Sequence, residues 1–187
     1  MEVEVELIPR VIKSKGATKA LRRQGTIPCV VYSKGTVGPN CAVSKVAIDT
    51  VLRELETGFL PTTIFILKDA SGKKRRAIIK DIQYKVTTYE VEHIDFMELI
   101  DDVKIDVKVP LQCLGVIECV GIKAGGYLRQ VKLHIPVRCF PKDIPSHFEV
   151  NVQDVDIRQT RRLSDVKIPA RVIPLMKPED VVVTIVK

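Results

Sequence analysis

Alternation of apolar and charged side chains with a period of two is the feature that most constrains how this chain folds. Val3, Val5 and Leu7 alternate with glutamates, and residues 103–109 repeat the pattern with valine and isoleucine against lysine and aspartate. This period places apolar side chains on one face of a strand and charged ones on the other. Valine and isoleucine also make up 47 of the 187 residues, and β-branched side chains favour sheets. The sequence therefore predicts a mainly β protein.

The first half of the chain predicts a small barrel with two short helices. Helix formers at 17–24 end at Gly25, and a second helical spacing begins after Ser44 and ends at Gly58. Between and after these helices, strands are expected at 2–8, 27–32, 62–68, 75–84 and 89–96. About five strands in sequential antiparallel pairs, with this little helix, indicate a closed or nearly closed β-barrel over residues 1–97.

The second half predicts a second all-β domain over residues 98–187. Many short apolar runs separated by turn signals, with no long helical pattern, are typical of such domains. The expected strands are 103–109, 115–120, 127–138, 147–152, 166–172 and 181–186. The glycine-rich segment 121–126 is expected to form a β-turn, because no strand-to-helix pattern follows it.

The excess of positive charge is concentrated near the N-terminus. The chain has 30 Lys and Arg against 23 Asp and Glu, a net charge of +7, yet there is no acidic residue from Leu7 to Ile48. That stretch has eight bases, which are Arg10, Lys13, Lys15, Lys19, Arg22, Arg23, Lys34 and Lys45. Such a run is typical of a partner with a phosphate backbone, although a solvated basic face gives the same pattern. A second cluster, residues 73–76 (KKRR), is expected at a hairpin tip and leaves the same two interpretations open.

Several classes of protein are disfavoured. No apolar run approaches the roughly 20 residues that span a bilayer, and the acidic start lacks the order of a signal peptide, so we expect an intracellular protein that contacts no membrane. Five cysteines without a C-x-x-C pair predict buried, reduced thiols and neither a disulfide framework nor a zinc ribbon. No nucleophile, base and orienting group occur in a known catalytic pattern. We therefore expect no enzyme, no metal or cofactor, and no small-molecule substrate.

The basic segment contains candidates for RNA contact. Lys19, Arg22 and Arg23 fall at i, i+3 and i+4 on the expected helix and so share one face. The helix N-terminus near residues 16–18 offers free backbone N–H groups to a phosphate. Thr18 can either cap the helix or donate to a phosphate or 2′-OH, and Tyr32 can either pack in the core or contact a base or ribose.

Polar side chains also gather on the last two strands expected in the barrel. His93 and Asp95 fall at i and i+2, on one face of the last strand, and Gln83 belongs to the strand before it. A polar set on one sheet face predicts contact with the edges of a nucleic-acid groove.

Four segments of the first half together resemble a known family. They are residues 15–22 (KGATKALR), 25–32 (GTIPCVVY), 79–83 (IKDIQ) and 93–96 (HIDF). In this order they are similar to the bacterial large-subunit ribosomal protein family numbered twenty-five. Residues 121–128 (GIKAGGYL) and 141–145 (PKDIP) resemble the second domain of its longer form, the general stress protein Ctc.

This resemblance implies a structural ribosomal protein whose barrel domain binds 5S rRNA in the central protuberance. The second domain is then expected to contact neighbouring 23S rRNA or ribosomal proteins, and the protein to act in the cytoplasm on the ribosome. By position, the RNA contacts of the family fall on Arg10, Lys15, Gly16, Thr18, Lys19, Arg22, Tyr32, Gln83, His93 and Asp95.

The chain departs from the family pattern at three places. Ala20 stands where the family usually has a second Arg, and Ser33 replaces a usual Gly. Residues 158–162 (RQTRR) are more basic than the turn expected there. The alternative function is a stress-related protein-interaction module whose basic face binds acidic partners.

Overall fold

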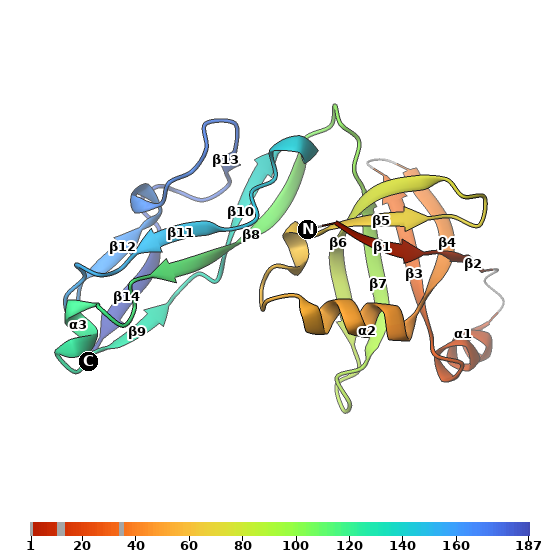
Figure 1. Cartoon of the computed structure of the whole chain (residues 1–187), viewed down its shortest axis with the longest axis horizontal. Coiled ribbons are helices and arrows are strands. Elements are labelled where there is room, and N and C mark those ends of the chain that lie inside the picture. The colour runs from red at the N-terminus through yellow and green to blue at the C-terminus, as the bar shows by residue number, and fades with distance from the viewer. Residues whose placement is uncertain (1, 11–13, 34–35) are drawn as a thin grey trace. The chain divides into compact units, whose positions relative to one another are not determined.

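The computed structural model describes residues 2–10, 14–33 and 36–187, and the chain divides into two compact units. The first unit comprises residues 1–101 and the second residues 102–187 (Figure 1). The expected boundary at residue 97 lies just before the end of the last barrel strand, which runs to Glu98. Lys13 and Lys34 of the basic run lie outside the described residues.

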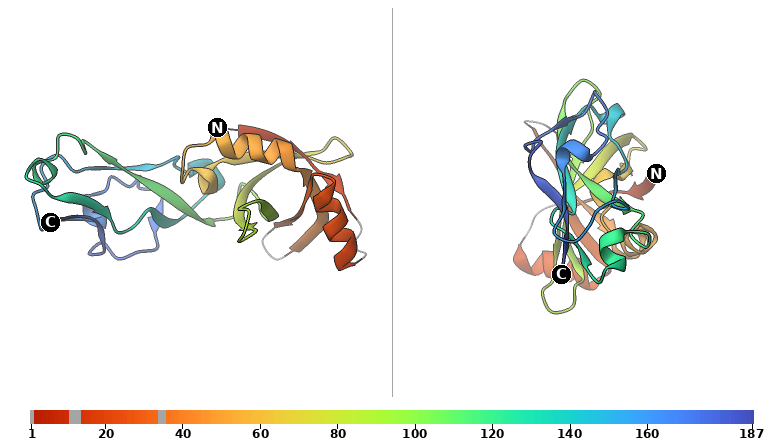
Figure 2. Two further views of the ribbon diagram at one scale, coloured as in Figure 1. Left: turned by 90° about the horizontal axis from the view of Figure 1, so that it is seen from below. Right: turned by 90° about the vertical axis from the view of Figure 1, so that its left-hand side faces the viewer.

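The first unit is a seven-stranded sheet that closes on itself. Its strands are β1 (Glu2–Glu6), β2 (Ile8–Pro9), β3 (Thr26–Ser33), β4 (Thr36–Ser44), β5 (Ile64–Lys68), β6 (Lys74–Tyr84) and β7 (Val91–Glu98), in the order β1-β5-β6-β7-β3-β4-β2. Only Leu7 separates β1 from β2, yet these strands pair at opposite ends of that order. One N-terminal segment thus joins the two edges, and the sheet curls into the expected barrel (Figure 2).

The pairing inside the barrel is more varied than the sequence predicts. The pairs β3–β4, β5–β6 and β6–β7 are antiparallel and sequential, as expected. The pairs β1–β5 and β3–β7 are parallel, so the expectation of antiparallel pairs alone was wrong. The strand β4 and the short strand β2 were not predicted.

Apolar side chains from alternate strand positions fill the barrel. The aromatic rings of Phe65 and Phe96 meet edge to face, with centroids 5.8 Å apart, and both side chains are fully buried. Val5 and Leu7 are buried with them, which confirms the one-sided strand expected from the alternation. Four of the five cysteines are buried and all are free, while Cys113 is only half-buried.

Two helices flank the barrel strands. Helix α1 (Lys15–Arg23) begins two residues earlier than expected, because Ser14 is its N-cap and accepts a hydrogen bond from the Ala17 amide at 3.3 Å. The predicted cap Thr18 instead lies inside the helix. Helix α2 (Lys45–Glu54) starts after Ser44, as predicted, and its Ile48 and Val51 are buried.

The second unit is built from two small sheets around one core. The first sheet has the order β11-β8-β10-β13 and the second β12-β14-β9. Buried side chains of both sheets form one hydrophobic cluster that includes Val109, Ile135 and Ile185. The strands are β8 (Ile105–Leu114), β9 (Tyr127–Gln130), β10 (His134–Cys139), β11 (Phe148–Asn151), β12 (Thr160–Arg162), β13 (Ile173–Pro174) and β14 (Val181–Val186). The prediction of a mainly β second domain is confirmed.

Some details predicted for the second unit were wrong. Residues 115–120 form a turn rather than a strand, and the expected β-turn over 121–126 begins instead with the short helix α3 (Val120–Lys123). The expected strand 127–138 is interrupted between β9 and β10. The expected strand 166–172 is irregular, because the amides of Val166 and Val172 bond carbonyls three residues back and so form turns.

Candidate nucleic-acid interface

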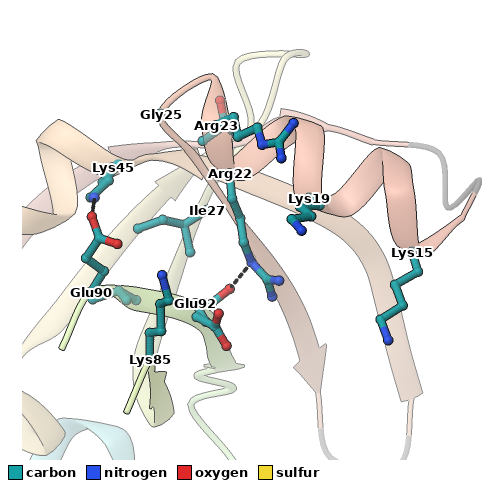
Figure 3. A pocket seen from close by; sticks show the side chains of 12 residues that line it. Lys15, Lys19, Arg22, Arg23, Gly25, Ile27, Lys45, Lys85, Glu90 and Glu92 are labelled. Atoms are coloured by element: carbon teal, nitrogen blue, oxygen red, sulfur yellow. Dashed lines mark hydrogen bonds and ion pairs between the residues drawn. The ribbon is translucent and has the colours of Figure 1, made fainter. Parts of the chain in front are cut away.

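Helix α1 presents its side chains to solvent. None of its residues is buried, its first turn has no acid, and Arg22 and Arg23 lie in its last turn, where positive charge interacts favourably with the helix dipole. Lys15, Lys19 and Arg22 are spaced at i, i+4 and i+7 and project to the same side (Figure 3). The helix is therefore a support for a row of positive charges.

This row borders an open groove of about 700 Å³. The opposite wall comes from α2 and from the adjoining ends of β6 and β7 (Figure 3). Six bases and two acids line the groove. The lining residues are Lys15, Lys19, Arg22, Arg23, Gly25, Thr26, Ile27, Lys45, Lys85, Glu90, Val91 and Glu92.

Two contacts fix the walls of the groove and leave most of its charge unpaired. Arg22 Nε donates to the main-chain oxygen of Glu92 at 3.1 Å, which ties α1 to β7. Lys45 Nζ lies 2.5 Å from Glu90 Oε1, and this contact lowers the pKa of Glu90 and raises that of Lys45. With that pair neutralised, five bases face the single carboxylate of Glu92. Among the described residues, no acid forms a salt bridge with the bases of α1.

The second basic cluster of the sequence has a different role. Lys74 pairs with Glu4 at 2.5 Å, Arg75 with Asp69 at 2.9 Å, and Arg76 with Asp101. Three of the four bases in residues 73–76 thus have acidic partners within the same unit. The structure therefore favours the interpretation of this cluster as part of the barrel's own surface.

A polar face on the outside of the barrel lies on β3, β6 and β7. Gln83 is paired with His93 across β6 and β7, and Asp81 with Asp95. His93 Nδ1 lies 2.8 Å from Asp95 Oδ1. The structure thus brings together the three side chains that the sequence predicted on these strands, and adds Asp81, which lies two residues before Gln83 on the same strand face.

Tyr32 belongs to this polar face. Val30 on β3 is the partner of Asp95, and Tyr32, two residues later, points to the same side as Val30. Burial, followed by the charges of Asp95 and Asp81, raises the pKa of the Tyr32 phenol. The side chain is only half-buried and is not part of the buried cluster of the barrel, so the core-packing interpretation of Tyr32 is wrong.

The other predicted residues lie apart from the groove lining. Arg10 Nε donates to the main-chain oxygen of Cys41 at 3.0 Å, next to the β2–β4 pair that closes the barrel. Thr18 Oγ1 donates to the Ser14 carbonyl at 3.3 Å. Gly16 is exposed, and only Ser14 Oγ lies within 4 Å of the position a Cβ would take there. Contact of these three residues with RNA stays a prediction.

Nine of the residues that line the groove were not in the set that the resemblance assigns to RNA contact, and five of these are charged, namely Arg23, Lys45, Lys85, Glu90 and Glu92. Arg23 and Lys45 belong to the acid-free run, so charge patterning contained a signal for both. Lys85 and Glu92 lie outside that run, and only the folding of the β6–β7 hairpin beside α1 brings them to the groove.

Other kinds of site find no support in the described parts of the chain. Among residues 2–10, 14–33 and 36–187, no group of three His, Cys, Asp or Glu side chains could hold a metal ion. No helix in the described segments is long and apolar enough to cross a membrane. The expected contact of the second unit with 23S rRNA or ribosomal proteins stays a prediction.

Comparison with known proteins covers both units. The Ribosomal L25p family matches residues 5–96, and the family described as ribosomal protein TL5, C-terminal domain, matches residues 104–187. Large ribosomal subunit protein bL25 of Chlamydia pneumoniae is 40% identical over 183 residues, 98% of each chain. The bL25 protein of Chlamydia abortus is 41% identical over the same length and share of each chain. That of Chlamydia muridarum is 39% identical over 185 residues, 99% of this chain and all of the relative. The chain belongs to the bL25 family of large ribosomal subunit proteins, in the two-domain form that has a TL5-type C-terminal domain.

Proposed function

We propose that this ribosomal protein acts in the cytoplasm by binding 5S rRNA in the central protuberance of the large subunit, and that it has no catalytic role. The observation that carries the proposal is the unequal pairing of its two basic clusters. The bases of residues 73–76 are mostly neutralised by acids of their own unit. The groove keeps five bases against one carboxylate. Phosphates are the partners that such a surface attracts most strongly.

The polar face of β3, β6 and β7 supplies contacts that charge alone does not. Gln83 offers an amide donor and acceptor, Tyr32 offers an O–H group, and His93 offers its second ring nitrogen. The minor groove of A-form RNA is wide and shallow, and displays 2′-hydroxyls and base edges. The polar side chains on the outer face of β3, β6 and β7 can donate to and accept from groups of this kind. In this arrangement the groove beside α1 holds the phosphate backbone of the RNA. The polar face of β3, β6 and β7 contacts the minor groove of the RNA helix.

The contact between His93 and Asp95 leaves one nitrogen of the imidazole ring for the RNA. Because Asp95 Oδ1 lies 2.8 Å from Nδ1, the Nδ1 position is occupied and Nε2 remains for the RNA. Asp95 thus fixes the orientation of the imidazole ring. Removing the imidazole should cost a hydrogen bond and its orientation, about 1–2 kcal/mol of binding free energy.

The test is filter binding of the full chain to 5S rRNA with tRNA as competitor. We expect the protein to prefer 5S rRNA, and His93→Ala to weaken binding about tenfold. His147→Ala is the matched control, because His147 Nε2 lies 3.3 Å from Glu149 Oε1 in the same i, i+2 arrangement in the second unit. Equal binding of 5S rRNA and tRNA refutes the proposal, and recovery of an acidic protein after RNase treatment supports the protein-interaction alternative.

A further inference from the structure

The tip of the β6–β7 hairpin exposes two apolar side chains. Residues 85–90 connect the strands, and in this loop Val86 is 87% exposed and Tyr89 80%. Tyr89 is the most exposed of the four tyrosines. Neither side chain contributes to the barrel core, so the fold does not explain why an aromatic ring stands at this tip.

The backbone of Tyr89 is strained. Its φ is +54°, in the left-handed region that is unfavourable for a residue with a bulky side chain. Glycine or asparagine would occupy this position at lower cost. Short hairpin loops commonly use a left-handed residue, and this chain has an aromatic residue there where glycine or asparagine is usual.

The tip is held rigidly despite its exposure. The amide of Tyr89 donates to the Lys85 carbonyl, and the amide of Lys85 donates to the Glu90 carbonyl, both at 2.8 Å. Glu90 accepts a hydrogen bond from Thr88 Oγ1 at 3.0 Å and is paired with Lys45 at the start of α2. The loop is thereby fastened to the neighbouring helix, and the ring projects from a fixed base.

The tip begins where the wall of the basic groove ends. Lys85 and Glu90, the two residues that start and finish the loop, both line the groove. The hairpin extends past them, away from the barrel (Figure 1). Tyr89 is the residue directly before Glu90, so its backbone lies next to the edge of the groove.

We propose that Tyr89 stacks on an unpaired nucleobase of the RNA bound in the groove, with Val86 packing against the same base. The proposal deepens the proposed function and rests on it. A base is the occupant that fits, because it combines an apolar π-face with the backbone phosphates that the five bases of the groove attract. Tyrosine has only two side-chain torsions to fix, and its backbone is already held by the loop.

Two substitutions separate the contribution of the aromatic ring to RNA binding from the effect of the backbone conformation. Tyr89→Phe keeps an aromatic ring, whereas Tyr89→Gly removes the ring and relieves the positive φ. We expect the phenylalanine variant to bind 5S rRNA within about twofold of the wild type. The glycine variant should bind about tenfold more weakly while unfolding at the same temperature or a higher one. The salt dependence should be unchanged in both, because no charge is altered.

Fluorescence gives a direct readout of stacking. The chain has no tryptophan, so Tyr89→Trp introduces a single indole at the tip. Tyr127→Trp, at a position 57% exposed in the second unit, is the matched control. Binding of 5S rRNA should quench the indole at position 89 strongly and the control weakly.

The outcomes distinguish this proposal from the one on which it rests. If the wild type binds 5S rRNA in preference to tRNA but Tyr89→Gly binds equally well, the stacking proposal alone is wrong. Equal quenching of the two indoles also overturns it. If Tyr89→Gly binds RNA normally but loses capture of a ribosomal protein, the tip contacts protein instead of a base. Failure of the wild type to prefer 5S rRNA overturns both proposals.

Discussion

Removing charge from α1 should change the salt dependence of RNA binding by a predictable amount. Lys15, Lys19 and Arg23 are exposed and form no described salt bridge, whereas Arg22 ties α1 to β7. The triple variant Lys15→Ala, Lys19→Ala, Arg23→Ala therefore removes three charges of the groove without removing the contact that fixes the helix. Alanine also favours the helical conformation, so α1 should remain folded.

The magnitude follows from the five bases that the groove leaves unpaired. If each neutralises one phosphate, the slope of log K against log salt is about −4.5, since each phosphate contributes roughly −0.9 on the duplex scale. Raising the salt from about 50 to 200 mM should then weaken wild-type binding about 500-fold. With three charges removed the slope falls to about −1.8, and the same change of salt weakens binding only about 12-fold.

The control removes the same charge from the other side of the barrel. Lys68, Lys73 and Lys74 are exposed, and replacing all three by alanine also subtracts three from the net charge of +7. This variant should keep the wild-type slope in filter binding to 5S rRNA from 50 to 200 mM salt. Equal slopes for the two triple variants would mean that binding depends on total charge, and would refute the assignment of the groove.

Three further predictions test the core, the helix and the thiols. Phe96→Ala removes the edge-to-face partner of the fully buried Phe65 and should lower the free energy of unfolding by about 3–5 kcal/mol in urea titration; a loss below about 1 kcal/mol would contradict this packing. Gly16→Ala meets only Ser14 Oγ, at 3.8 Å, so the melting temperature should not fall. Affinity for 5S rRNA should drop severalfold if the Gly16 backbone touches RNA as the family implies, and unchanged affinity removes Gly16 from the interface. Burial raises the pKa of the Cys29 thiol to about 12. The unfolded thiol therefore loses its proton first as the pH rises, and the stability present below about pH 9 should be lost towards pH 12 in thermal melts, less so in Cys29→Ala.

The sequence predicted the regular strands well because their side chains alternate. Strand β5 buries the alternate residues Phe65 and Leu67, and β1 buries Val5 between exposed glutamates; this period of two is visible without knowledge of the partner strand. Strand β6 buries the consecutive residues Ala77, Ile78 and Ile79, and its prediction depended on the turn signal before it. Strand β4 was missed because it contains Gly38 and Pro39 and has no alternating pattern. Its place in the barrel depends on pairing with β3 and β2, which lie elsewhere in the sequence. The parallel pairs were missed for the same reason.

The site was predictable in its residue types but not in its electrostatics. Charge patterning identified two basic clusters and could not rank them, because salt-bridge partners come from distant positions. Lys74 is neutralised by Glu4, 70 residues away in the sequence. By contrast, no described acid forms a salt bridge with the bases of α1, and Glu92 is the one unpaired carboxylate that lines the same groove. Only the folded structure shows which cluster has charge available for a partner.

The contacts that hold α1 in place favour a role in binding over a role in forming the core. A nine-residue helix is too short to be stable through propensity alone, and α1 buries no side chain in the core, so it contributes little hydrophobic stabilisation. It is held instead by the Ser14 cap and by the bond from Arg22 to the Glu92 carbonyl. Because the helix lies on β3 with only half-buried side chains and is fastened at both ends, most of its surface stays open to a partner. Strands β1 and β2 anchor the chain in the barrel shortly before α1, and β3 anchors it shortly after α1. The barrel thereby holds a row of positive charges beside the polar face of β3, β6 and β7, the arrangement from which we propose contact with both the backbone and the minor groove of an RNA helix.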